Sequence, residues 1–243
     1  MNLPLVNVFH RTYKKFRYVS LTHQEIMSRN FLGGKFIDTD RKELVFTISN
    51  PYTAAMYMCK VGADNSLGNH VEESLERDEN FKKMLSLMPE ETPDIFIEYK
   101  LTPNMVNSTD LHKAILNINM SLSKNQYLYH GGLWGNDRES IITQRPLSTS
   151  FCPQVALRNA EHNDKAFDAG RLDLFVIMVV ESSTPVFVYP EIEDTVNEKE
   201  VLFASGARLK KKWEHKITDN YRAPSKKHEH KKIPAYIIFV EMS

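Results

Sequence analysis

The chain has 243 residues, of which 42% are hydrophobic and 26% are charged, which is typical of globular proteins and excludes a disordered or fibrous chain. Thirty-one lysines and arginines balance thirty-one acidic residues, so the overall charge does not indicate binding to nucleic acid or to a membrane surface. The longest apolar run, Leu174 to Val180, is too short to span a bilayer as a helix.

The amino-terminal segment does not have the order of a secretory signal. Its apolar part precedes its basic part and is interrupted by Pro4 and Asn7, whereas a signal peptide carries its positive charges first. We therefore expect a chain that stays in the cytosol, or that a specialised secretion system delivers into the cytosol of a target cell. Cys59 and Cys152 are too few for a disulfide framework, and we expect two reduced thiols.

The first hundred residues mix helices and strands. Thr22 and Glu25 have the spacing of a capping box, which predicts a helix that begins there and ends at Gly33-Gly34. Asn50 and Pro51 predict a cap and first-turn proline for a helix that runs to about Lys60. The other elements expected in this region are a strand over 43–49, a polar loop over 62–69, a helix over 71–88 and a strand over 94–100.

The second half of the chain is richer in short strands. A helix capped by Ser108 carries apolar residues at helical spacing, and a second helix begins at Pro153 and ends near His162. Strands are expected over residues 126–131, 147–151, 173–181, 185–189, 198–203, 207–213 and 234–241. This pattern predicts an α+β fold with two packed small β-sheets flanked by helices over residues 106–243, preceded by a mixed helical and strand extension over residues 1–105.

Three stretches of the second half contain side chains that could take part in catalysis or bind a ligand. The first, Tyr127–Gly132, reads YLYHGG and places a histidine and two glycines at the end of a strand. The second, Pro146–Phe151, reads PLSTSF, and the third, Asn197–Phe203, reads NEKEVLF and is followed by Ala204-Ser205-Gly206. Each stretch is common on its own. The three together, in this order and at this spacing, indicate a function.

Together these stretches resemble the mono-ADP-ribosyltransferase superfamily, which moves ADP-ribose from NAD to an acceptor. The resemblance covers about residues 108–243 and implies that NAD is bound as a substrate, without a metal. It also implies a protein substrate in a target cell, as for bacterial toxins and effectors. We expect no membrane partner and no nucleic-acid partner.

The E-x-E pair, Glu198 and Glu200, is expected to be the catalytic centre. Residues two apart in a strand point the same way, so both carboxylates would face one cavity. A fixed carboxylate stabilises the positive charge that develops on the ribose when nicotinamide leaves. The resemblance assigns that role to Glu200, and assigns to Glu198 the task of readying the acceptor, with arginine as the leading acceptor.

The hydroxyl residues of the second stretch are expected to form the cofactor-binding scaffold. The resemblance gives Ser148 the role of bracing the catalytic glutamate and contacting the ribose, with Thr149 and Ser150 in support. A hydroxyl both donates and accepts, so it can orient a carboxylate without adding charge. Phe151 is expected in the core.

His130 and Gly131 are the remaining cofactor-binding residues. The serine-motif branch of the superfamily has arginine at the first position, whereas a second branch has Tyr-His-Gly. There the histidine binds the ribose and the glycine backbone binds the nicotinamide amide. Gly131 and Gly132 remove side chains where a ligand ring could approach the backbone, although a plain turn would explain them equally well. With His130 in place of arginine, the group that holds the pyrophosphate is open among Arg138, Arg145 and Arg158.

The segment 189–197 lies where the superfamily has a loop that meets the acceptor, and its acidic residues would suit a basic acceptor. His228-Glu229-His230 is expected to be a solvated loop rather than a metal site, and Lys210–Trp213 a surface strand rather than a nucleic-acid site. Two other functions remain open on the same fold: an NAD glycohydrolase that ends at water, and a non-catalytic binding module.

Overall fold

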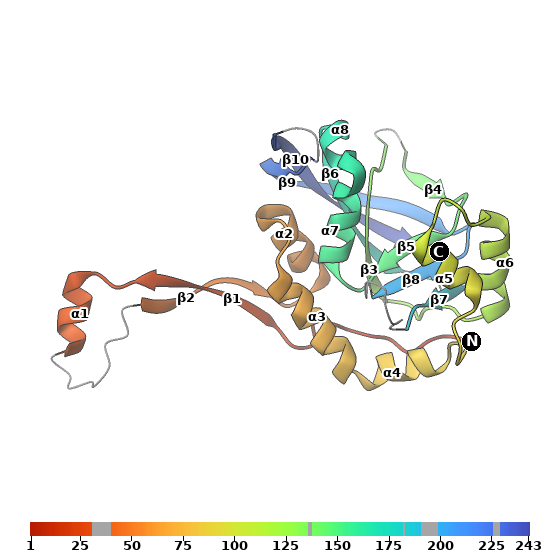
Figure 1. Cartoon of the computed structure of the whole chain (residues 1–243), viewed down its shortest axis with the longest axis horizontal. Coiled ribbons are helices and arrows are strands. Elements are labelled where there is room, and N and C mark those ends of the chain that lie inside the picture. Colours follow the sequence, from red (N-terminus) through yellow and green to blue (C-terminus); the bar gives the residue numbers. More distant parts are fainter. Residues whose placement is uncertain (31–39, 136–137, 182, 191–198, 226–228) are drawn as a thin grey trace.

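The computed structural model describes residues 1–243 except 31–39, 136–137, 182, 191–198 and 226–228. Its centre is an eight-stranded sheet with the strand order β4-β9-β10-β6-β3-β5-β8-β7 (Figure 1). All neighbours in this sheet are antiparallel except β10 and β6, which run parallel. The strands are β3 (Tyr127–Gly132), β4 (Ser140–Ile142), β5 (Leu147–Ser150), β6 (Leu172–Val179), β7 (Val186–Val188), β8 (Glu200–Phe203), β9 (Arg208–Ala223) and β10 (Lys231–Met242).

Helices cover this sheet in two groups. The first group packs over the middle strands, and the second lies beside the β7 end (Figure 1). The α+β class expected from the sequence is confirmed. The helices are α2 (Pro51–Val61), α3 (Asn65–Arg77), α7 (Pro153–Glu161) and α8 (Lys165–Ala169) over the middle strands, α5 (Asp94–Leu101) and α6 (Ser108–Ile118) beside β7, and α4 (Glu79–Ser86) following α3. No helix of the described residues is long and apolar enough to cross a membrane.

The sheet has a seam between β3 and β5. These strands share one residue pair, Tyr129 with Ser150, whereas β3 pairs with β6 along its whole length. The two expected small sheets therefore correspond to two halves of one sheet, β4-β9-β10-β6-β3 and β5-β8-β7, which a single pair joins.

A long arm projects from the body of the molecule (Figure 1). It consists of the antiparallel strands β1 (Tyr13–Ser20) and β2 (Asp40–Ile48) with α1 (His23–Asn30) between them. The backbone N–H of Thr22 donates to Glu25 Oε2 at 2.8 Å, which confirms the expected capping box at α1. The Gly33-Gly34 stop lies outside the described residues.

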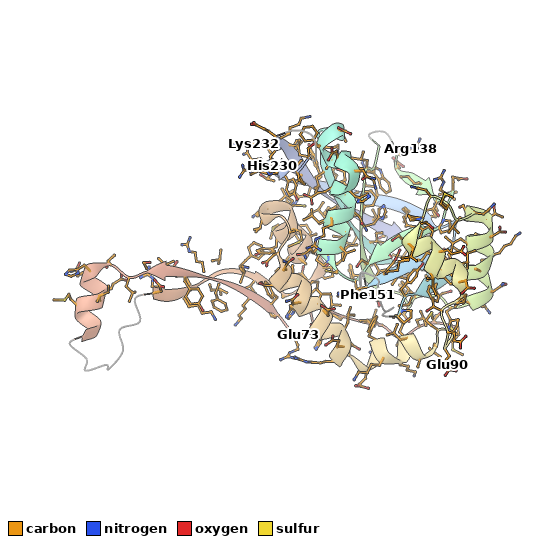
Figure 2. All side chains as sticks on the ribbon, viewed as in Figure 1. Glu73, Glu90, Arg138, Phe151, His230 and Lys232 are labelled. Carbon is orange, nitrogen blue, oxygen red and sulfur yellow. The ribbon has the colours of Figure 1, made fainter. Side chains whose placement is uncertain are left out.

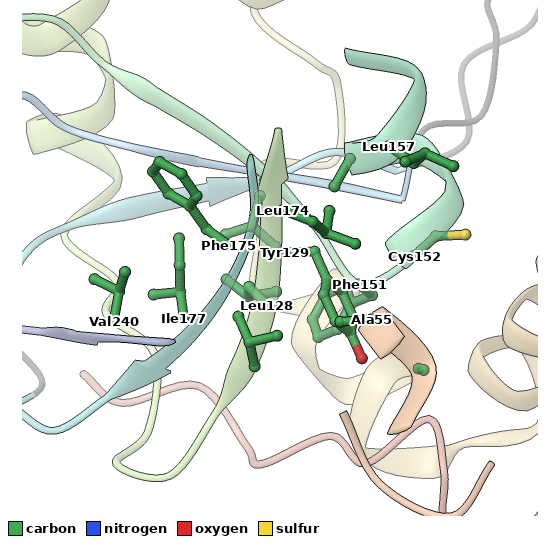
Figure 3. Close-up of a cluster of buried hydrophobic side chains, with 14 of the residues drawn as sticks. Ala55, Leu128, Tyr129, Phe151, Cys152, Leu157, Leu174, Phe175, Ile177 and Val240 are labelled. Atoms are coloured by element: carbon green, nitrogen blue, oxygen red, sulfur yellow. The ribbon is translucent and has the colours of Figure 1, made fainter. Parts of the chain in front are cut away.

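One continuous apolar core joins the amino-terminal segment to the sheet. It contains Leu3 and Val6 together with Leu174 and Met242, so residues from both sides of position 105 contribute to it. Figure 3 shows part of this core, with Tyr129 of β3 near Phe151. The buried Gln126 side chain ties this segment down, because its amide both accepts from the Val6 N–H and donates to the Val6 carbonyl at 2.9 Å.

Several expected elements are confirmed. Asn50 caps α2, its side chain accepting from the Thr53 N–H, and Pro51 is in the first turn. Pro153 likewise begins α7. Both cysteines are free and buried. Phe151 is 1% exposed, as expected of a core residue.

Other expected elements were wrong. Residues 94–100 form helix α5, not a strand. The helix expected over 71–88 is two helices, because the Asp78 side chain caps α4 by accepting from the N–H groups of Asn80 and Phe81. The polar loop over 62–69 ends early, since α3 already begins at Asn65. Strands β1 and β4 were not expected, and β9 continues ten residues past the predicted end at Trp213.

Candidate functional site

Glu200 begins β8 and is buried, with an exposed fraction of 4%. It lies opposite Ser150 across the β5–β8 ladder, which puts its side chain on the sheet face that Ser148 shares, two residues along β5. The Ser148 hydroxyl donates to Glu200 Oε1 at 2.5 Å. The bracing contact inferred for this pair from the sequence is therefore present.

His130 reaches across the seam from β3 to the same point on β5. Its Nδ1 lies 2.7 Å from the Ser148 carbonyl oxygen. Because a carbonyl only accepts, Nδ1 carries the proton of the neutral ring, and Nε2 presents a lone pair. Burial lowers the pKa of His130, with the hydrogen bond to Ser148 opposing that change. The ring is thus a neutral hydrogen-bond acceptor at pH 7.

Gly131 and Gly132 each lack a side chain for a different structural reason. A Cβ at Gly131 would lie 1.9 Å from the Ala156 carbonyl oxygen, so the absence of a side chain lets α7 pack on β3. A Cβ at Gly132 would lie 3.0 Å from His130 Nε2, so this glycine keeps the free nitrogen of the histidine uncrowded. The packing of α7 on β3 therefore accounts for the missing side chain at Gly131.

These residues meet at one cavity of about 570 Å³. Of the residues predicted from the sequence, it is lined by His130, Gly131, Ser148 and Glu200. The size is within the range of small-molecule sites. The structure therefore gathers the histidine, serine and glutamate of three separate sequence stretches around one space.

Thr149 and Ser150 support the backbone instead of lining this cavity. The Thr149 hydroxyl donates to the Val201 carbonyl at 2.8 Å. The Ser150 hydroxyl accepts from the Cys152 N–H at 3.0 Å and donates to the Lys199 carbonyl at 3.4 Å. Both residues therefore fix β5 against β8 and the turn into α7, which agrees with a supporting role.

Lys199, between the two glutamates, has a left-handed backbone with φ of 50°. The alternation of an extended strand is broken there, because a strand requires negative φ at every residue. β8 accordingly begins only at Glu200. Glu198 lies outside the described residues, as do 191–197 of the expected acceptor loop, so the shared direction of the two carboxylates stays a prediction.

Sequence reasoning missed three basic residues that line the cavity. Lys100 on α5, and His162 and Lys165 beside the end of α7, line it together with Asn159. Lys100 Nζ lies 3.9 Å from Glu200 Oε2, and the two side chains are 7% and 5% exposed. Residues 94–100 alternate as in a strand, and a strand in this region gave no reason to expect Lys100 at the site. Only the helix brings Lys100 to the cavity.

The three arginines considered for the pyrophosphate are not among the described residues that line this cavity. Arg145 lines a neighbouring cavity of about 340 Å³, which shares Tyr99, Pro103 and Asn104 with it. Arg158 donates to the Asn65 side chain at 3.0 Å. Arg138 is exposed and lies near β4 at the rim of the molecule (Figure 2).

Two weaker sequence signals lie away from the cavity. His230 is beside Lys232 near the outer end of β10 (Figure 2), and His228 lies outside the described residues. In the part of the chain that the structure describes, no three metal-ligating side chains are grouped. On β9, Lys211 forms an ion pair with Glu214, and Lys212 forms one with Glu241. Acidic side chains of the same fold therefore balance the charges of both lysines.

No family model and no curated protein matches the chain. Solved structures similar to it include C3larvin toxin, an ADP-ribosyltransferase from Paenibacillus larvae, with a TM-score of 0.38, 12% identity and coverage of 68% of this chain and 94% of that chain. The ADP-ribosylating toxin BECa of C. perfringens has a TM-score of 0.34 and 16% identity over 92% of this chain and 44% of that one. The ADP-ribosyltransferase Vis toxin from Vibrio splendidus has a TM-score of 0.29 and 16% identity over 79% and 67%. Because these TM-scores are low, function is inferred below from the side chains of the cavity.

Proposed function

We propose that the chain cleaves NAD between nicotinamide and ribose and transfers the ADP-ribose to a protein side chain. The observation that carries this proposal is the meeting of His130, Ser148 and Glu200, with Ser148 bonded to both of the others through its hydroxyl and its carbonyl. A buried, oriented carboxylate stabilises the positive charge of an oxocarbenium-like transition state, and a neutral ring beside it adds no opposing charge.

Each group has a defined task in this reaction. The electron pair of the C–N bond leaves with nicotinamide, which becomes neutral, while positive charge develops on the ribose and is stabilised by Glu200. Ser148 holds that carboxylate in place, and His130 Nε2 accepts from a ribose hydroxyl. The acceptor then attacks the ribose, and Glu198 takes its proton. Arginine is the acceptor that the resemblance favours.

The phosphates of NAD need a cationic partner, and Lys165 supplies one at the cavity wall. In this proposal residues 106–243 bind NAD, while residues 1–105 contribute α5 to the wall and recognise the target. The protein then acts as a toxin or effector in the cytosol of another cell.

Incubation with labelled NAD, with and without a cell lysate, tests the proposal. Label on a lysate protein together with nicotinamide release supports the transferase. Free ADP-ribose without labelled protein indicates a glycohydrolase, and the absence of turnover indicates a binding module. Glu200→Gln preserves side-chain size and is expected to lower nicotinamide release roughly 100-fold or more, by analogy with removing one transition-state-stabilising group. Unchanged release in this variant would contradict the proposal.

A further inference from the structure

Each oxygen of the Glu200 carboxylate has a partner among the described residues, and Ser148 and Lys100 come from distant parts of the chain. Oε1 accepts from the Ser148 hydroxyl at 2.5 Å. Oε2 faces Lys100 Nζ at 3.9 Å. Lys100 lies 48 residues before Ser148 in the chain and belongs to α5, in the amino-terminal region.

The ammonium of Lys100 is held where it is by the docking of α5. One helical turn before it, Phe96 stacks on Phe187 of β7 with ring centroids 3.9 Å apart. The Tyr189 hydroxyl donates to the Phe96 carbonyl at 3.1 Å, and the Lys100 ammonium lies 4.9 Å from the centroid of the Tyr189 ring. Phe96 and Lys100 are four residues apart and therefore share one helix face, so the stack that anchors the helix also aims the lysine.

A carboxylate this deeply buried is costly to ionise unless a cation or several donors compensate it. The Ser148 hydroxyl supplies one hydrogen bond but no charge. Lys100 supplies the charge from the other side, and two contacts on different oxygens also restrict rotation of the carboxylate about its last bond.

We propose that Lys100 is a positioning residue that holds Glu200 ionised and oriented, so that helix α5 completes the active site. This inference rests on the proposed function, because it gives Lys100 no contact with NAD. Among the described residues, the other charged or titratable groups that line the cavity are Tyr99, His130, His162 and Lys165. Lys199, next to Glu200 in the chain, pairs with Glu72 at 3.2 Å.

Kinetics of three variants test the proposal. Lys100→Met keeps the length of the side chain and removes its charge, Lys100→Arg keeps the charge, and Lys113→Met, at a lysine that is 67% exposed on α6, is the matched control. We expect Lys100→Met to lower kcat about tenfold or more near pH 6, with a change in KM for NAD below about threefold. An opposite charge this close lowers a carboxylate pKa by roughly one unit or more, so the acid limb of kcat should move to higher pH by a similar amount. Lys100→Arg should restore most of kcat, and Lys113→Met should match wild type.

A second measurement needs no turnover. The titration of the Glu200 carboxyl is followed by carbon NMR of glutamate-labelled protein, with the signal assigned through Glu200→Gln. The midpoint should be higher in Lys100→Met than in wild type and Lys100→Arg. An unchanged midpoint, or an equal loss of kcat in Lys100→Met and Lys100→Arg, would overturn the role of Lys100. If wild type releases no nicotinamide, the proposed function fails, and the midpoint still decides whether Lys100 holds the charge of Glu200.

Discussion

The carbonyl of Ser148 accepts from His130 while its hydroxyl donates to Glu200, so this one residue of β5 links the side chains that β3 and β8 bring to the cavity. The two distances are 2.7 Å and 2.5 Å. Orientation of the histidine depends on the backbone of residue 148, whereas orientation of the glutamate depends on its side chain. The two can therefore be separated by mutation.

Ser148→Ala should remove the hydrogen bond that orients Glu200 and leave the orientation of His130 unchanged. Losing a hydrogen bond to a charged group costs about 1.5–3 kcal/mol, which corresponds to a loss of roughly 10- to 100-fold in nicotinamide release. Affinity for NAD should fall less, because the His130 contact to the carbonyl is retained. Steady-state kinetics and calorimetric NAD binding give the two numbers. Equal losses in both would mean that Ser148 mainly binds NAD.

The stability of the protein should depend on His130 below neutral pH. Burial lowers the pKa of this ring from 6.5, so the unfolded chain takes up the proton first as the pH falls. Its contribution to the free energy of unfolding is present above pH 6.5 and is lost as the pH falls through the lowered pKa.

This contribution is isolated by comparison with His130→Asn, because Glu161 and Asp173, whose pKa values burial raises, act in the opposite direction. The melting temperature of wild type minus that of the variant should be larger at pH 8 than at pH 5. A difference independent of pH would contradict the assignment of a buried neutral ring.

Gly131→Ala should destabilise the fold at the contact between β3 and α7. The new Cβ would lie 1.9 Å from the Ala156 carbonyl oxygen and 2.5 Å from the Ala160 nitrogen, both backbone atoms. Overpacking of this kind costs roughly 1–3 kcal/mol, or about 2–4 °C of melting temperature per kcal/mol in a chain of this size.

Gly68→Ala on α3 is the control, because the atom nearest to its Cβ would be the side-chain nitrogen of Gln154, at 3.3 Å, and not a backbone atom. Alanine favours a helix over glycine by about 1 kcal/mol, so its melting temperature should stay the same or rise. If Gly131→Ala melted like wild type, α7 would have to sit farther from β3 than it does here.

The arm should be dispensable for folding of the body. Residues 16–45 can be removed and Lys15 joined to Phe46 through Asn-Gly, which suits a two-residue hairpin turn. This keeps the pairs Tyr13–Ile48, Lys14–Thr47 and Lys15–Phe46, and also the Lys15 contact to Asp64 at 2.8 Å.

Tyr18 and Leu44, which the excision removes, are 73% and 53% exposed, so little buried area is lost. The melting temperature and nicotinamide release should both stay near wild type, whereas modification of a protein target should fall if the arm recognises it. Unfolding of the excised protein would show that the arm stabilises the body.

The sequence predicts the α+β class and most elements because capping and strand signals are local. Asn50-Pro51 and Pro153 mark helix starts by chemistry that needs no neighbours. The histidine, serine and second glutamate of the cavity were also predictable, since each belongs to a short strand and the three stretches follow one another in a recognisable order.

Helix α5 could not be predicted from its pattern. Ile95, Ile97 and Tyr99 alternate as in a strand, yet Phe96 and Lys100, one turn apart, share the helix face that meets Phe187 and Glu200. A lysine on that face interrupts the apolar stripe by which a helix is recognised in a sequence. The left-handed backbone of Lys199 is likewise invisible in the sequence, because lysine has no preference for it.

The single residue pair between β3 and β5 has a consequence for the wall of the cavity. Beyond that pair the two strands share no further residue pair among the described residues, and next to it the His130 imidazole donates to the Ser148 carbonyl. A side chain thus takes over from the backbone ladder beside Glu200, so the two strand edges are held together without a continuous ladder.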